Sequence, residues 1–350
     1  MKAAAFWTPV VVAVLTAGRG VVGEPAAGAG AEAGQQEMSP GVVNGHAENT
    51  VTPGAEGATI SGGGGSLYGR LFPNRVTDVF GTVAGGMGNQ AGDGASTASN
   101  CEFATVGGGV WNTAHHPRST VAGGSVNTAR GDCAAIGGGN YNTARGFAAT
   151  IPGGQYNMAR GDYSFAAGRR AQADHPGAFV WGDSTDADVN STGEDQFVAR
   201  ASGGIWFYSN RQATTGVHLA RGSGAWSSAS DRNAKADFQT IDGRQVLDRL
   251  AQVPVQTWSY KSQDPSIRHL GPAAQDFYAA FGLGEDNKHI STVDADGVAL
   301  AAIQGLHQLL KEKDAELSAL KKQNRNLAAR LSAVETALAG LARTAKKPAE

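Results

Sequence analysis

The stretch Ile136-Gly137-Gly138-Gly139-Asn140-Tyr141-Asn142-Thr143-Ala144-Arg145-Gly146 decides the fold, because it belongs to an internal repeat. Neighbouring copies place asparagines at positions 112, 127, 142 and 157, so the copies follow one another at a constant step of fifteen positions. Each copy joins a short apolar alternation to a Gly-Gly turn and an asparagine. Further starts lie at Ile60 and Val83, and a decayed one at Phe165. A fixed period of this kind indicates a stacked repeat architecture.

So short a period leaves no room for a helix pair and predicts one coil of a β-solenoid, whose copies must stack to bury their faces. Glycine permits positive φ at the corners, and asparagine tolerates the same left-handed conformation. The longer step from Asn89 to Asn112 predicts a looped-out insertion that carries Cys101. We expect the repeated asparagines to occupy one corner and to form a ladder along the stack: Asn112, Asn127, Asn142 and Asn157.

Composition excludes several classes of protein. The 50 glycines do not recur at every third position, which excludes collagen. A net charge of −2 lacks the excess of positive charge that binding to nucleic acid needs. No Gly-Lys-Ser/Thr follows a glycine run, so we predict no phosphate-binding loop and no cofactor. The pair His115-His116 lacks a Cys or carboxylate cluster, and no metal is predicted. Cys101 and Cys133 are either a disulfide or two separate thiols.

Changes in amino-acid composition along the chain predict its domain organisation. Residues 1–23 form a weak secretory signal with Lys2 at its start, and no membrane span is predicted beyond it. Residues 24–40 form a disordered linker, 41–175 the repeat head and 176–229 a β-rich neck. Glycine then becomes scarce: residues 230–300 form a small α+β domain, 301–343 a long helix and 344–350 a tail.

The long helix carries a heptad repeat. Two series spaced by seven interleave to give the 3-4 pattern of a coiled-coil seam, and the polar Asn324 within it favours one register. A single amphipathic helix on a globular body is the alternative, but the pattern persists for more than five heptads. The seam residues are Ile303, Leu306, Leu310, Leu317, Leu320, Asn324, Leu327, Leu331, Val334 and Leu338.

Three short motifs precede and enter this helix. They are Ser-Asp-Arg-x-x-Lys at 230–235, His-x-Gly-x-x-Ala-Gln at 269–275 and Val-Asp-x-Asp-Gly at 293–297. Taken alone, Ser230 and Lys235 fit a helix N-cap beside a solvated lysine. They also fit a nucleophile with a nearby general base, since a serine hydroxyl attacks only when a base removes its proton.

Two family resemblances follow from these motifs. The repeat resembles the head repeats of trimeric autotransporter adhesins, which implies a left-handed parallel β-roll assembled as a homotrimer. Residues from Ser230 to about Lys313 resemble the intramolecular chaperone autoprotease domain of phage tailspikes, endosialidases and tail fibres. The overall expectation is therefore a mostly β solenoid head, then a small α+β chaperone domain that ends in a coiled coil.

The second resemblance implies a set of site residues and a reaction. In that family the module trimerises, templates folding of the fibre and cuts itself off. Carried onto this chain, the scissile bond is Ala229–Ser230, with Ser230 the nucleophile and Lys235 its base. Supporting roles fall to Asp231, His269, Gly271 and Gln275.

Several functions remain open at this point. The first is an exported or surface fibre whose module is cleaved, with a cell-surface or polysaccharide ligand. The second is an uncleaved adhesive trimer that keeps the module as a foot. A polysaccharide-cleaving fibre lacks a paired-carboxylate arrangement in the repeats, and a membrane-anchored transcription regulator lacks a basic DNA-binding region.

Overall fold

The computed structural model describes residues 41–95 and 97–344. The expected signal peptide (1–23), the linker (24–40) and all but the first residue of the tail (344–350) lie outside these residues. The chain divides into two compact units, one up to Arg200 and one from Ala201. Within the described ranges, no helix combines the length and the apolar character that crossing a bilayer requires.

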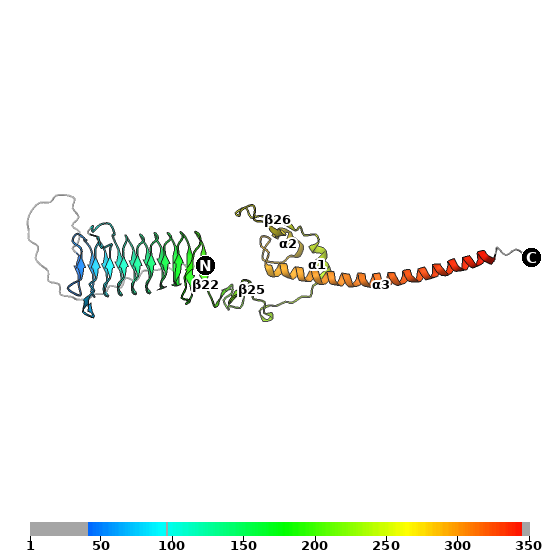
Figure 1. Cartoon of the computed structure of the whole chain (residues 1–350), viewed down its shortest axis with the longest axis horizontal. Coiled ribbons are helices and arrows are strands. Elements are labelled where there is room, and N and C mark those ends of the chain that lie inside the picture. Colours follow the sequence, from blue (N-terminus) through cyan, green and yellow to red (C-terminus); the bar gives the residue numbers. More distant parts are fainter. Residues whose placement is uncertain (1–40, 96, 345–350) are drawn as a thin grey trace, which may run out of the picture. The chain divides into compact units, whose positions relative to one another are not determined.

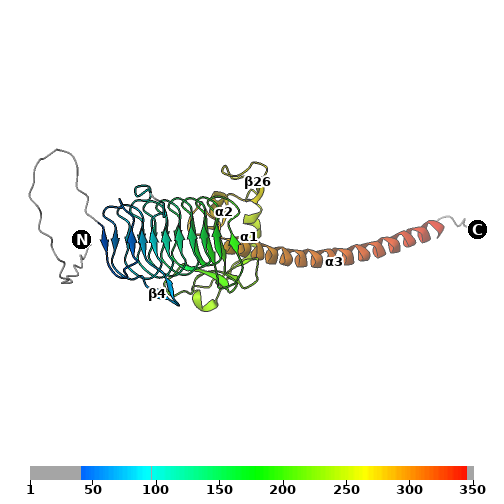
Figure 2. The ribbon, with the colours of Figure 1, turned by 60° about the vertical axis from the view of Figure 1, so that its left-hand side comes forward.

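The first unit is a parallel β-solenoid, which confirms the predicted fold class (Figures 1 and 2). Its coils contribute very short strands to two parallel sheets. Sheet 1 contains β1 (Val42–Val43), β3 (Thr59–Ile60), β7 (Thr82–Val83), β9 (Thr105–Val106), β11 (Thr120–Val121), β13 (Ala135–Ile136), β15 (Thr150–Ile151), β18 (Phe165–Arg169), β20 (Phe179–Gly182) and β22 (Phe197–Arg200), with β16 (Gly154–Gln155) beside β18. Sheet 2 contains β2 (Thr50–Val51), β6 (Arg75–Val76), β8 (Gln90–Ala91), β10 (Thr113–Ala114), β12 (Thr128–Ala129), β14 (Thr143–Ala144), β17 (Met158–Ala159), β19 (Ala171–Ala173) and β21 (Val189–Asn190).

The interior of each coil is thin, which explains the glycine- and alanine-rich composition. Sheet 1 points one aliphatic side chain per coil inward, such as Val121 or Ile136, and sheet 2 points an alanine, such as Ala129 or Ala144. All four are at most 1% exposed. Two side chains of this size fill the space between the sheets, so the core grows by stacking rather than by thickness.

The predicted asparagine ladder is present. The N–H of Asn142 donates to Oδ1 of Asn127 one coil earlier (3.1 Å), and Asn127 and Asn157 make the same contact with their preceding rungs. The side-chain amide of each asparagine also donates to two glycine carbonyls, for Asn142 those of Gly138 and Gly154. These asparagines are at most 1% exposed, and buried polar groups need such complete pairing.

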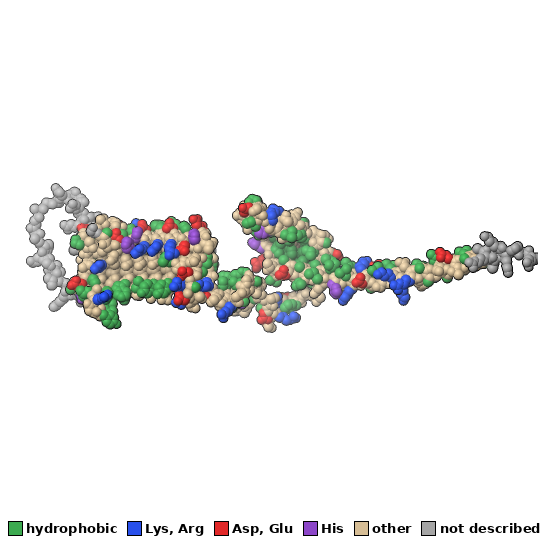
Figure 3. Space-filling model, viewed as in Figure 1, with side chains coloured by type: hydrophobic (Ala, Val, Ile, Leu, Met, Phe, Trp, Pro, Cys, Tyr) green, Lys and Arg blue, Asp and Glu red, His purple; other side chains and the backbone are tan. Residues whose placement is uncertain are grey.

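The conformation expected of these asparagines is wrong. The left-handed residue is the one before each asparagine, with φ between 54° and 56° at Trp111, Val126, Tyr141 and Tyr156. The asparagine is not free to take that conformation because its N–H must point along the stack to the previous rung. The exposed residue before it turns the corner instead, and Tyr141 stacks on Tyr156 with ring centroids 5.1 Å apart. Figure 3 shows hydrophobic side chains in a stripe along one edge of the solenoid.

The solenoid continues beyond the expected head of residues 41–175. Strands β18, β20 and β22 extend sheet 1 to Arg200, so residues 176–200 belong to the stack and not to the expected neck. The repeat is hidden there because its steps become unequal and because the N–H of Ala171, not of another asparagine, donates to Oδ1 of Asn157. Phe165, Phe179 and Phe197 stack on one another in this part, 4.5 Å and 4.8 Å apart.

Two insertions interrupt the regular coils. Residues 92–104 form the insertion predicted between Asn89 and Asn112, and these two asparagines remain neighbouring rungs of the ladder. A second insertion forms the antiparallel hairpin of β4 (Ser66–Leu67) and β5 (Arg70–Leu71). It separates Asn49 from Asn74, two further rungs that the sequence pattern did not reveal.

The second unit begins with a three-stranded antiparallel sheet, the neck sheet, of β23 (Gly204–Tyr208), β24 (Gly216–Ala220) and β25 (Trp226–Ser228). A 3-10 turn, η1 (Arg232–Ala234), follows. The remaining elements are α1 (Gly243–Leu250), the antiparallel pair β26 (Gln256–Trp258) and β27 (His269–Gly271), α2 (Ala274–Phe281) and the long helix α3 (Thr292–Thr344).

Helix α1 crosses α3 at two glycines. A Cβ atom on Gly305 would lie 2.2 Å from the carbonyl oxygen of Gly243, so the backbones touch at this point. Asp242 caps α1 by accepting from the N–H of Arg244 (2.9 Å), and Arg244 forms an ion pair with Glu312 of α3 (2.8 Å). The first part of α3 therefore belongs to the folded module, and the rest of the helix extends beyond it.

Candidate functional site

The structure brings Ser230 and Lys235 together. The Nζ atom of Lys235 donates a hydrogen bond to the Oγ atom of Ser230 over 2.7 Å. This distance is within the range at which a base can take a proton from a hydroxyl. Both side chains are exposed in the single chain.

The local sequence explains this contact. The carboxylate of Asp231 accepts from the N–H of Asn233 (2.9 Å) and caps the turn Arg232–Ala234. The capped turn reverses the chain within one 3-10 turn, so Lys235 returns to Ser230. The cap is therefore Asp231 and the capped element is a 3-10 turn, whereas the alternative reading gave Ser230 this role in a helix. Asp231 positions the pair through the backbone.

Ala229, on the other side of the candidate scissile bond, is held by the neck sheet. Its N–H donates to the carbonyl of Gly216 (3.0 Å), which extends the pairing of β25 with β24 by one residue. Ala229 also lines a pocket of about 290 Å³ with Trp206 and His218, whose rings stack 4.2 Å apart. The bond Ala229–Ser230 thus lies where the chain leaves a sheet and enters a capped turn.

The surroundings of Ser230 and Lys235 are open and partly apolar. Every residue from 221 to 242 is exposed in the single chain. Phe238 is 58% and Ile241 62% exposed, and the guanidinium of Arg232 lies over the ring of Phe238 at 4.6 Å. The apolar seam residues of α3 are exposed too, between 45% and 62% from Ile303 to Leu338. These are the surfaces that association with other chains would cover.

The residues of the motif at 269–275 form their hydrogen bonds and ring contacts with residues other than Ser230 and Lys235. The ring of His269 stacks on Trp258 (4.7 Å), and its Nε2 is 2.8 Å from Oε1 of Gln263. Gly271 and Gln275 line a cleft of about 510 Å³ with Trp258. Within one described chain these residues build the β26–β27 region, and none of their hydrogen bonds reaches Ser230 or Lys235.

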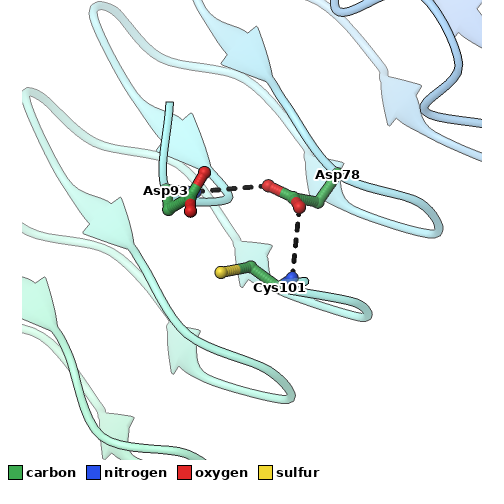
Figure 4. Close-up of side chains that lie close together, drawn as sticks. All are labelled: Asp78, Asp93 and Cys101. Carbon is green, nitrogen blue, oxygen red and sulfur yellow. Dashed lines mark hydrogen bonds between the residues drawn. The ribbon is translucent and has the colours of Figure 1, made fainter. Parts of the chain in front are cut away.

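A cluster that the sequence pattern missed lies in the solenoid (Figure 4). Polar atoms of Asp78, Asp93 and Cys101 lie within 4.8 Å of one another. The fully buried carboxylate of Asp78 accepts from the N–H groups of Cys101 (3.1 Å) and Asp93 (3.2 Å) and from the hydroxyl of Thr77 (2.8 Å). Through the N–H groups of Asp93 and Cys101, Asp78 anchors the insertion to the preceding coil, while the hydroxyl of the adjacent Thr77 supplies the third donor.

The same cluster alters the chemistry of Cys101. Burial, and then the charges of Asp78 and Asp93, raise the pKa of the Cys101 thiol to about 12. Cys101 is buried, Cys133 is half-buried, and both are free thiols. A thiol with so high a pKa is a poor nucleophile at neutral pH. The hydrogen bonds that the N–H groups of Cys101 and Asp93 donate to Asp78 give the cluster a structural role in holding the insertion.

Comparison with known proteins identifies the second unit's central part. No curated protein and no solved structure matches the chain. Residues 230–282 match a peptidase family model described as the chaperone of endosialidase, and the match begins at Ser230 itself. Residues 230–282, which follow the parallel β-solenoid along the chain, are thus similar to the chaperone of endosialidase family.

Proposed function

We propose that the chain is a trimeric, tail-fibre-like protein whose C-terminal module assembles three copies and then cuts itself off between Ala229 and Ser230. The observation that carries the proposal is the 2.7 Å contact between Lys235 Nζ and Ser230 Oγ, directly after the candidate bond. The family match begins at the same serine, and its name is that of a peptidase family.

The reacting groups are the carbonyl of Ala229, the hydroxyl of Ser230, the amine of Lys235 and a water molecule. Lys235, in its neutral form, takes the proton of the Ser230 hydroxyl, and Oγ attacks the carbonyl carbon of Ala229. The C–N bond breaks as the Ser230 nitrogen takes up a proton, which leaves an ester between Ala229 and Oγ. Water then hydrolyses the ester, freeing the Ala229 carboxylate and the serine hydroxyl. Because the nucleophile belongs to the residue it cuts before, proximity is built into the chain.

Cleavage would depend on assembly. A lysine acts as a base only when neutral, which burial favours, yet Lys235 is exposed in the single chain. Association of α3 along its exposed seam would gather three modules and cover Phe238 and Ile241 near the pair. The cut would thereby follow completed trimerisation. The neck sheet, which holds Ala229 through Gly216, would stay with the fibre.

The alternative is a fibre that keeps its module permanently. It shares the same assembly and differs at one peptide bond. For either form we propose an exported or virion-surface location and a cell-surface or polysaccharide ligand for the fibre, in keeping with tail-fibre-like proteins.

Intact mass separates the two forms. The full chain, with Ser230→Ala and Lys235→Ala variants, would be expressed and analysed by denaturing gel and mass spectrometry. We expect two fragments that meet at Ala229–Ser230 in the unaltered chain and one full-length product in both variants. An unaltered chain that stays whole while light scattering gives a trimer would exclude cleavage and leave the permanent foot.

A further inference from the structure

We propose that the outward face of sheet 1 is the surface on which the solenoids of neighbouring copies meet. The inference rests on the proposed trimer and adds which side of the solenoid faces the other copies. It starts from the alternation along each sheet 1 strand. The second residue, such as Val121, points into the coil and is buried, so the first and third residues, such as Thr120 and Ala122, point outward.

At the first and third positions of its strands, the outward face of sheet 1 carries no charge over nine consecutive coils. Its first positions are Thr59, Thr82, Thr105, Thr120, Ala135, Thr150, Phe165, Phe179 and Phe197. Its third positions are Ser61, Ala84, Gly107, Ala122, Gly137, Pro152, Ala167, Trp181 and Ala199. Two arginines end strands of this sheet: Arg169, the fifth residue of β18, forms an ion pair with Asp186, and Arg200, the fourth residue of β22, forms one with Asp183.

The corresponding face of sheet 2 is different. The residue directly after the strand is charged in four consecutive coils, as Arg130 after β12, Arg145 after β14, Arg160 after β17 and Asp174 after β19, and Arg75 adds a charge at a first position. All three arginines of the run are exposed. In the regular coils the strands of both sheets have two residues each, so the backbone does not account for the difference in charge. We infer that it reflects a difference in what each face meets. Sheet 2 has the composition of a water-facing surface.

A charge-free face suits contact with copies of itself. Around a rotation axis, each residue near the axis meets its own copies, so any charge there would face a like charge. Threonine, alanine and glycine also leave the face flat, which lets sheets approach closely. The last three coils add apolar anchors: Phe165, Phe179 and Phe197 form a stacked row, with Phe197 68% exposed and Trp181 38% exposed beside it.

The identity of the partner follows from the rest of the chain. Helix α3 presents an exposed heptad seam, and seams of this pattern are covered when helices with the same repeat pack together in a coiled coil. Copies joined there hold their solenoids at high effective concentration, which makes even a weak face-to-face contact form within the assembly. A second copy is therefore the occupant that the structure favours for this face.

Cross-linking at matched positions tests the proposal. The full chain would carry Ser230→Ala, to keep solenoid and coiled coil in one molecule, with Cys101→Ser and Cys133→Ser. A single cysteine would be introduced as Thr120→Cys on sheet 1 or as Thr128→Cys on sheet 2. Both threonines are half-buried, outward-facing first residues of two-residue strands in the same coil. Each protein would be treated with a short bis-maleimide and run on a denaturing gel.

We expect Thr120→Cys to give covalent dimers at a rate independent of protein concentration, and Thr128→Cys to give at least ten-fold less. Light scattering on the same samples reports the mass. A trimer in which Thr128→Cys cross-links as well as Thr120→Cys, or in which neither does, would overturn the face assignment and leave the trimer standing. A monomeric mass would instead refute the trimer on which the inference rests.

Discussion

The N–H of Asn142 donates to the side-chain oxygen of Asn127, one coil earlier, over 3.1 Å, and neither residue is exposed to solvent. Each asparagine side chain of the ladder thus accepts a hydrogen bond from the backbone of the next asparagine along the stack. Replacing the Asn127 rung leaves the buried N–H of Asn142 and the part-buried carbonyl of Gly123 without partners, whereas the Gly139 carbonyl still accepts from the N–H of Ser125. Each unpaired buried group costs about 1–3 kcal/mol.

We therefore predict that Asn127→Ala destabilises the solenoid by about 2–6 kcal/mol, the sum for these two groups. Thermal unfolding followed by circular dichroism would measure the loss, and hydrogen exchange would show faster exchange of the Asn142 amide. Thr128→Ala, the next residue but half-buried, is the control and should change stability by less than about 1 kcal/mol. Equal effects of the two changes would mean that the ladder is not a major source of stability.

Asp231 should set the rate of self-cleavage without taking part in the chemistry. An N-cap contributes about 0.5–2 kcal/mol, so loss of the Asp231 cap should lower the population of the turn that returns Lys235 to Ser230. We predict that Asp231→Ala slows cleavage roughly 2- to 30-fold at an unchanged bond, measured by intact mass over time. Asp231→Asn, which caps equally well, should cleave at nearly the normal rate. Equal slowing by both variants would point to a role for the charge instead.

Cys101 should be unusually inert toward alkylation. Its pKa is raised to about 12, first by burial and then by Asp78 and Asp93, so at pH 8 its thiolate fraction is roughly a thousand-fold below that of an ordinary cysteine. We predict that iodoacetamide labels Cys133 of the folded protein at least a hundred-fold faster than Cys101, as read by peptide mass spectrometry. In denaturant the two should react alike. Comparable native rates would show that the insertion 92–104 opens readily.

The same shift predicts a loss of stability at high pH. The pKa of the Cys101 thiol rises from its ordinary value of 9.0 in the unfolded chain to about 12 in the folded chain, so the folded chain keeps the proton at a pH where the unfolded chain releases it. Stability from this group is therefore complete below pH 9 and declines as the pH rises through this interval. Cys101→Ser should flatten this part of the curve in alkaline denaturation experiments. An unchanged slope would assign the alkaline loss to other groups.

The glycine at the helix crossing gives a prediction opposite to helix propensity. Alanine favours a helix over glycine by about 1 kcal/mol, but a Cβ on Gly305 would lie 2.2 Å from the Gly243 carbonyl oxygen. Gly305→Ala should separate α1 from α3 and destabilise the module by about 1–3 kcal/mol, seen in urea unfolding at 222 nm. Gly340→Ala, in the same helix with open space around it, should have no such cost. If both changes stabilise, α1 does not pack on α3 as described.

The sequence predicts well those parts of the structure that have a regular period. The constant step between asparagines revealed the coils and the ladder from Asn112 to Asn157, and the heptads revealed α3. Ser230 and Lys235 were also predictable as a pair, because only five positions and one capped turn separate them. In each case the contact follows from a local rule applied at a known spacing.

The contacts that escaped prediction depend on packing between segments without a period. The coils after Phe165 keep the stack through three phenylalanines at unequal steps, where no asparagine or triple glycine marks the corner. Asp78 and Cys101 meet because the insertion folds back over a coil, which no spacing encodes. The aromatic surroundings of His269 likewise form only once β26 and β27 pair.

The uniformity of the ladder bears on how long the fibre is. A coil such as 128–142 receives from the coil before it and offers to the coil after it the same set of hydrogen bonds, so its upper and lower edges are interchangeable. Removing or duplicating one repeat unit would restore the ladder hydrogen bonds at the new junction and change the length of the solenoid by about 4.8 Å per coil. Recombination between repeats can therefore tune the distance the fibre spans in small equal increments, without any compensating substitution.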